Sequence, residues 1–130
     1  MASRVRLCQI ATGEVVVLQL ELAANFWTRF CGLQFRRQLA SDAGLLIVPC
    51  SSIHTHWMRF AIDVAFLNRE GEVLLIREAI APWRMLAGPR HTFAVLEVPA
   101  GELAGKLKLG DKLALRKKSE VCSLEFASRL

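Results

Sequence analysis

Short runs of apolar and β-branched residues, separated by residues that favour turns, follow one another along most of the chain. In the second run Leu18, Leu20 and Leu22 alternate with polar side chains, which is the period-two pattern of a strand with one buried face. A less regular run precedes it, and the turn residues at 11–13 separate the two. Residues 5–22 therefore predict a β-hairpin.

A second hairpin is predicted where the runs at 62–67 and 72–80 flank a four-residue turn that ends in glycine. The segment 81–90 contains two prolines and a glycine, so we interpret it as a loop. Further strands are predicted at residues 44–48, 92–98, 113–116 and 121–126.

One segment has a helical period instead. Asn25 is a suitable N-cap for a helix. Phe26, Phe30 and Leu33 follow it at i, i+4 and i+7, so a short helix from Asn25 to Leu33 is predicted to cover the sheet. The whole pattern predicts a mainly β fold: a compact antiparallel β sandwich or barrel, jelly-roll-like, with one short helix, in a single domain of residues 1–130.

Composition narrows the class of protein. No apolar run approaches the roughly 18 residues that a membrane span requires, and the N-terminal residues lack the apolar stretch of a signal peptide. The net charge of +5 comes from scattered cations, so we expect no nucleic-acid partner. The four cysteines form no CxxC pair, which favours free thiols, and we expect a cytoplasmic monomer. They are Cys8, Cys31, Cys50 and Cys122.

The stretch from His54 to Leu67 concentrates polar and aromatic residues beside an apolar run. Asp63 lies inside that run, where a buried carboxylate requires hydrogen-bond donors. We expect the donor to be Arg59, Arg29, or backbone amides of another segment. The candidate binding residues are His54, Thr55, His56, Trp57, Met58, Arg59, Asp63 and Glu97.

Three catalytic or metal-binding arrangements are alternatives to a simple binding site. A His-x-His pair such as His54 and His56 begins many metal sites, but Arg59 and Phe60 stand where a third ligand usually follows. His91 is the alternative third ligand, from a loop elsewhere in the chain, but we expect neither a metal nor another cofactor. Cys50 lies four residues before His54, a spacing that allows thiol activation. Asp63 and Glu97 are a possible acid–base pair, although single charges in apolar strands are more often structural.

Several motifs together resemble the family known as domain of unknown function 192. They are Arg29-Phe30-Cys31-Gly32-Leu33-Gln34-Phe35-Arg36, Gly44-Leu45-Leu46, Trp57-Met58, Ile62-Asp63-Val64-Ala65-Phe66, Val95-Leu96-Glu97-Val98-Pro99-Ala100-Gly101 and Gly110-Asp111. The resemblance implies a compact, jelly-roll-like β domain, and it implies no activity. His54-Thr55 resembles one branch of the family. Gln34 and His56 depart from the family pattern, which more often has methionine and an aromatic residue at these places.

Three classes of function follow from the residues. The first is a binding or accessory module that holds a small molecule or a partner protein near residues 54–59. The second is a small hydrolase or lyase, and the third is a structural domain of a larger assembly. The first ranks highest because polar residues are concentrated without a recognisable catalytic set.

Overall fold

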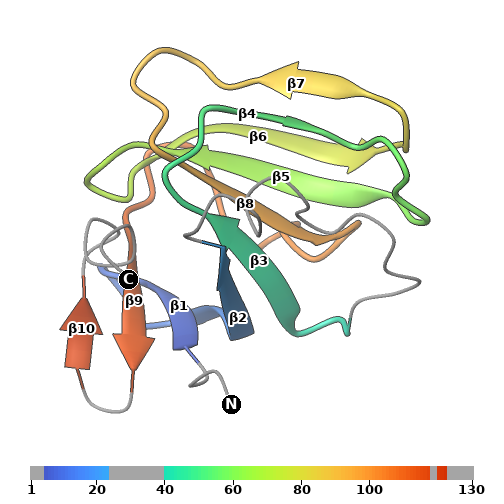
Figure 1. The fold of residues 1–130 in the computed structure, drawn as a ribbon. Coiled ribbons are helices and arrows are strands. Elements are labelled where there is room, and N and C mark those ends of the chain that lie inside the picture. The colour runs from blue at the N-terminus through green and yellow to red at the C-terminus, as the bar shows by residue number, and fades with distance from the viewer. Residues whose placement is uncertain (1–4, 24–39, 118–119, 123–130) are drawn as a thin grey trace.

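The computed structural model describes residues 5–23, 40–117 and 120–122, and of the last three only the backbone. Ten strands and no helix make up the secondary structure of these residues (Figure 1). The predicted helix from Asn25 to Leu33 lies outside them. The strands are β1 (Val5–Gln9), β2 (Val15–Ala23), β3 (Ala43–Ile47), β4 (Ser52–His54), β5 (Ile62–Leu67), β6 (Val73–Ile80), β7 (Met85–Ala87), β8 (Ala94–Pro99), β9 (Leu113–Lys117) and β10 (Glu120–Cys122).

Eight of these strands form one sheet, in the order β10-β9-β1-β2-β3-β8-β5-β6, and β4 pairs with β7 in a separate small sheet. The two predicted hairpins are confirmed as the antiparallel pairs β1–β2 and β5–β6. The prediction of a wholly antiparallel sheet is wrong at β2 and β3, which run parallel, with Gln19 opposite Ala43. Residues 24–42 connect these strands and provide the length that a parallel crossover requires.

The large sheet curls, because the start of β6 is bonded to the turn before β9. The Val73 amide donates to the Asp111 carbonyl at 2.8 Å, and the Leu113 amide donates to the Gly71 carbonyl at 2.8 Å. Gly71 has a φ of +81°, and a Cβ atom at this position would lie 2.2 Å from the Leu113 carbonyl oxygen, so only glycine fits. The all-β prediction is confirmed. The described strands form one mixed sheet and one two-stranded sheet, and they do not show the predicted closed barrel or jelly roll.

Both faces of the sheet are buried at β5. Ala65 and Leu67 lie in one core cluster, which includes residues of β1, β2 and β9, whereas Val64 and Phe66 lie in a second cluster on the opposite face. The small sheet covers this second face, since Ile53 of β4 belongs to its cluster and Leu86 of β7 packs against it. In the view of Figure 1, β4 and β7 lie above β5 and β6.

The loop predicted at 81–90 is therefore only partly a loop, because it contains β7. Three residues between a proline-containing turn and Gly88 are too few to show strand periodicity in the sequence. Their pairing with β4 is a tertiary contact, with Ile53 opposite Leu86 and His54 opposite Met85. This pairing brings residues 81–85 beside the His54–Arg59 stretch.

Candidate functional site

Asp63 is fully buried on β5, the strand next to the edge strand β6, and backbone amides hold its carboxylate. Its Oδ1 accepts a hydrogen bond from the Ala79 amide at 2.8 Å. Its Oδ2 accepts from the Gly101 amide at 2.9 Å and, more weakly, from the Leu103 amide at 3.4 Å. Backbone amides were one of the expected donors. Arg59 is exposed and is not among the donors, and Arg29 lies outside the described residues.

The bond from Ala79 shows what Asp63 does for the fold. On β5 one residue lies between Ile62 and Val64, but two residues lie between their partners on β6, Ile80 and Arg77. The strand β6 therefore carries an extra residue in a β-bulge. Ala79 lies in this bulge with a φ of 53°, a left-handed conformation that costs energy in a non-glycine residue. The carboxylate accepts the bulge amide that has no partner in the ladder. Asp63 thus stabilises the point at which β6 ends.

Glu97 is buried as well, with 3% of its surface exposed, but it lies on the other face of the sheet. It is opposite Val64 of β5, whereas Asp63 is opposite Val98. Directly opposed residues share a face, and neighbours along a strand point to opposite faces. The two carboxylates therefore do not form the acid–base pair considered from the sequence.

Thr55 joins the His54–Arg59 stretch to the segment that precedes β7. Its side chain is buried, and its hydroxyl donates to the Ala81 carbonyl at 2.8 Å and accepts from the Arg84 amide at 2.8 Å. The Thr55 backbone also donates to the Arg84 carbonyl and accepts from the Trp83 amide. One residue thus satisfies the polar groups of a whole loop, which is why a threonine can be buried here.

His54 and His56 lie together beside this threonine. Their Nδ1 atoms are 3.1 Å apart, so one imidazole donates its Nδ1–H and the other accepts. Partial burial and, to a smaller extent, the neighbouring His56 lower the pKa of His54 below its ordinary value of 6.5. Burial therefore favours the neutral form of His54. β4 ends at His54, so a tight turn and not a continuous strand brings the two rings together.

Trp57 and Trp83 form an exposed aromatic pair next to the histidines. Their ring centroids are 4.8 Å apart in an edge-to-face arrangement, and the Trp83 ring also contacts His56 at 5.3 Å. Trp57 is 56% exposed and Trp83 is 54% exposed. Both have a positive φ, 64° and 66°, although left-handed backbone is unfavourable for bulky residues. Met58, the residue after Trp57, is buried, and Arg59 after it is exposed.

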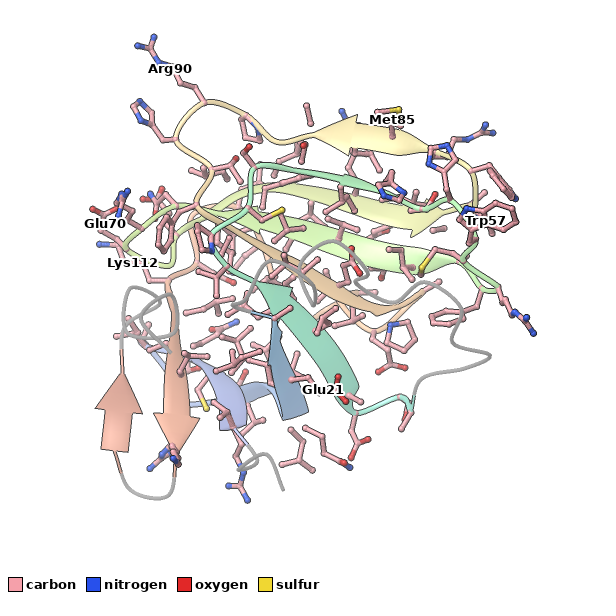
Figure 2. The ribbon with its side chains drawn as sticks, in the orientation of Figure 1. Glu21, Trp57, Glu70, Met85, Arg90 and Lys112 are labelled. Carbon is pink, nitrogen blue, oxygen red and sulfur yellow. The ribbon has the colours of Figure 1, made fainter. Side chains whose placement is uncertain are left out.

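The other half of this cluster was missed from the sequence. Trp83, Arg84 and Met85 follow Pro82 in a segment interpreted as a plain loop, and Met85 is 79% exposed. Figure 2 shows Met85 pointing outward from β7, above the end of the molecule where Trp57 lies. The sequence did contain a signal for this half. Tryptophan, methionine and arginine are enriched in protein contact surfaces, and all three occur together in this short segment.

The family model DUF192, described as an uncharacterized ACR, matches residues 8–115. The chain belongs to the DUF192 family. This DUF192 chain is 32% identical over 110 residues to a UPF0127 protein of Pyrococcus furiosus, covering 80% of this chain and 92% of that protein. It is 31% identical over 94 residues to a UPF0127 protein of Thermococcus sibiricus, covering 68% of this chain and 60% of that protein.

Two solved structures resemble this DUF192 domain. A Sinorhizobium meliloti protein described as a "putative transcription regulator" has a TM-score of 0.73 at 27% identity, over 87% of this chain and 95% of that one. A protein of unknown function from Novosphingobium aromaticivorans has a TM-score of 0.72 at 25% identity, over 85% and 82% of the two chains. These comparisons do not support the narrower assignment to a branch marked by His54 and Thr55.

The remaining candidates for chemistry in the DUF192 domain are Cys50 and a metal site. The Cys50 thiol donates to the Ser52 carbonyl oxygen at 3.0 Å. Within the described residues, no three histidine, cysteine, aspartate or glutamate side chains cluster as metal ligands. That part of the chain also has no helix long and apolar enough to cross a membrane.

Proposed function

We propose that this domain is an accessory module that binds a partner protein through the surface formed by Trp57, Trp83, Met85, Arg59 and Arg84, here called the aromatic face. The observation that carries the proposal is the contact between Trp57 and Trp83. Each ring leaves more than half of its surface in water, and each backbone adopts a costly left-handed conformation. A backbone that holds two exposed rings in contact at this cost suits a rigid aromatic contact surface.

The composition of the aromatic face supports a protein partner. Tryptophan, methionine and arginine are enriched at protein interfaces, and tryptophan and arginine dominate their binding energy. All five side chains of the face are exposed. The hydrogen bonds of Thr55 hold the two segments of the face together, so the surface is organised before a partner arrives, which lowers the cost of binding.

Charge specifies the kind of partner. Residues 49–61 and 81–93 contain Arg59, Arg84 and Arg90, and neither segment contains aspartate or glutamate. The three arginines are exposed. Two segments that carry exposed arginines and no acidic residue are complementary to an acidic segment, and such complementarity selects partners.

A titration tests the proposal with defined probes. A heptapeptide that alternates glutamate and valine is added to the 15N-labelled protein, and a peptide of alternating lysine and valine is the charge control. We expect the acidic peptide to shift the indole signals of Trp57 and Trp83. Trp57→Ala and Trp83→Ala should each weaken its binding roughly thirtyfold, as for a tryptophan that contributes about 2 kcal/mol.

The matched control is Leu109→Ala, which removes another exposed apolar side chain, 63% exposed, from a turn distant in sequence from the aromatic face. This variant should bind like the wild type. Equal binding of the two peptides, or unchanged binding by Trp83→Ala, would overturn the proposal. Because the Sinorhizobium meliloti protein is described as a regulator of transcription, duplex DNA is the competing probe. If duplex DNA binds more tightly than the acidic peptide and displaces it from the protein, the partner is DNA and not a protein.

A further inference from the structure

The outer edge of β7 has backbone groups directed away from the rest of the protein. The Gly88 amide donates to the Ser51 carbonyl at 2.8 Å, and the Thr55 amide donates to the Arg84 carbonyl at 2.8 Å. Bonded and non-bonded pairs alternate along an antiparallel ladder. Leu86, opposite Ile53, therefore directs its backbone groups toward β4, and the residues on either side of it direct theirs outward.

These outward residues are Met85 and Ala87. The small sheet contains only β4 and β7, so no further strand covers this edge in the described parts of the chain. Among those residues, the backbone hydrogen bonds outside the strand ladders do not use the amides or carbonyls of Met85 and Ala87. In the view of Figure 1, β7 forms the outer boundary of the molecule on this side.

Edge strands are normally protected from pairing by charges, prolines or bulges. The edge strand β6 of the large sheet follows this rule, because it carries Arg77 and Glu78 and a bulge at Ala79. The three residues of β7 are uncharged and lie in regular register with β4. Only the short length of β7 limits its pairing with another strand.

We propose that an extended acidic segment of the partner protein pairs with the outer edge of β7 as an added strand. This inference rests on the proposed function and specifies its mode. Figure 2 shows Met85 on β7 between Trp57 at one end and Arg90 at the other. A segment laid along β7 thus bonds to the backbone at Met85 and Ala87, while its ends reach the aromatic pair and an arginine. Main-chain bonds of this kind give affinity, and the flanking side chains give specificity.

One substitution removes the edge donor and leaves the small sheet intact. In Ala87→Pro the outward N–H is lost, while the bonds between β4 and β7 come from Arg84, Leu86 and Gly88 and are retained. Proline is tolerated on an edge strand when its nitrogen faces solvent. Ala87→Val is the matched control, because it keeps the N–H and has a high strand propensity.

The probe is again the heptapeptide that alternates glutamate and valine. We expect Ala87→Pro to weaken its binding by about tenfold, the effect of one lost backbone hydrogen bond in a desolvated contact, and Ala87→Val to bind like the wild type. Binding should also slow hydrogen exchange at the Met85 and Ala87 amides. A peptide N-methylated at alternate residues should bind as weakly as the unmodified peptide binds to Ala87→Pro, and this arm needs no protein variant.

The outcomes separate the two proposals. If the peptide binds and Trp57→Ala weakens it, but Ala87→Pro and N-methylation have no effect, the aromatic face stands and strand addition is overturned. If the wild type does not distinguish the acidic from the basic peptide, the proposed function fails and this inference fails with it. Loss of binding in both Ala87→Pro and Ala87→Val, with full binding of the N-methylated peptide, would also overturn strand addition.

Discussion

Replacing Asp63 should destabilise the protein more than any change on the aromatic face. Asp63→Asn substitutes an amide for one carboxylate oxygen, so the new NH₂ group must face either the Ala79 amide or the Gly101 amide. Two donors then oppose each other in a site with no exposure to water. Asp63→Ala removes both oxygens and leaves the buried amides without their acceptor.

The magnitude follows from the bond lengths. Two of the three bonds to Asp63 are short, at 2.8 and 2.9 Å, and a hydrogen bond to a charged group contributes about 1.5–3 kcal/mol. Release of the buried carboxylate from its desolvation cost offsets part of the loss. We expect Asp63→Ala to lower the free energy of unfolding by about 3–5 kcal/mol and Asp63→Asn by about 2–4 kcal/mol. For a chain of 130 residues, 1 kcal/mol corresponds to about 4 °C in Tm, so Asp63→Ala should melt about 12–20 °C lower.

Thermal and urea unfolding measure this loss directly. The control is Asp42→Asn, because the Asp42 carboxylate is half-buried and accepts a single side-chain bond, from Gln19 at 2.8 Å, which an asparagine oxygen can also accept. This control should stay within about 1 kcal/mol of the wild type. If Asp63→Ala unfolds within that same margin, the amide bonds do not stabilise the bulge and Asp63 becomes a candidate for direct binding.

Three further outcomes are expected. Gly71→Ala should cost more than about 2 kcal/mol in urea unfolding, because it combines a positive φ with a steric clash, whereas Gly13→Ala, with a φ of +75° and open space around it, should cost about 1 kcal/mol. Thr55→Val should cost about 1–3 kcal/mol and weaken the near-ultraviolet circular dichroism of the tryptophans, because a buried hydroxyl with two 2.8 Å bonds is lost. The lowered pKa of His54 means that the unfolded state binds a proton first as the pH falls, so Tm should decline below about pH 6.5 and then level off, and His54→Asn should decline less. A steeper decline in that variant would contradict the role of the pair with His56.

The sequence predicted the local part of the fold and not the long-range part. Alternation and turn residues are local signals, so the hairpins β1–β2 and β5–β6 were predicted correctly. The parallel pairing of β2 and β3 depends on a crossover whose direction no period-two pattern encodes. The curl of the sheet depends on a close approach of Gly71 to Leu113, two residues that are distant in sequence.

The candidate site divides in the same way. The contiguous half, from His54 to Arg59, was located by its concentration of polar and aromatic residues. The half that contains Trp83 was not, because β7 has three residues and is recognised only when it pairs with β4. Asp63 and Glu97 point to opposite faces of the sheet. The sequence could not predict this, because it depends on the register of β5 against β8.

The buried residues that hold the site in place differ from the exposed residues that are proposed to bind. Backbone amides converge on Asp63, and a carboxylate, which only accepts, suits that place better than a side chain that carries donors. Thr55 performs the corresponding task for the segment before β7, with one donor and one acceptor. These two buried side chains fix the end of β6 and the loop that follows it. The exposed rings of Trp57 and Trp83 are thus held by the backbone beneath them, and removing either ring tests binding with little effect on the core.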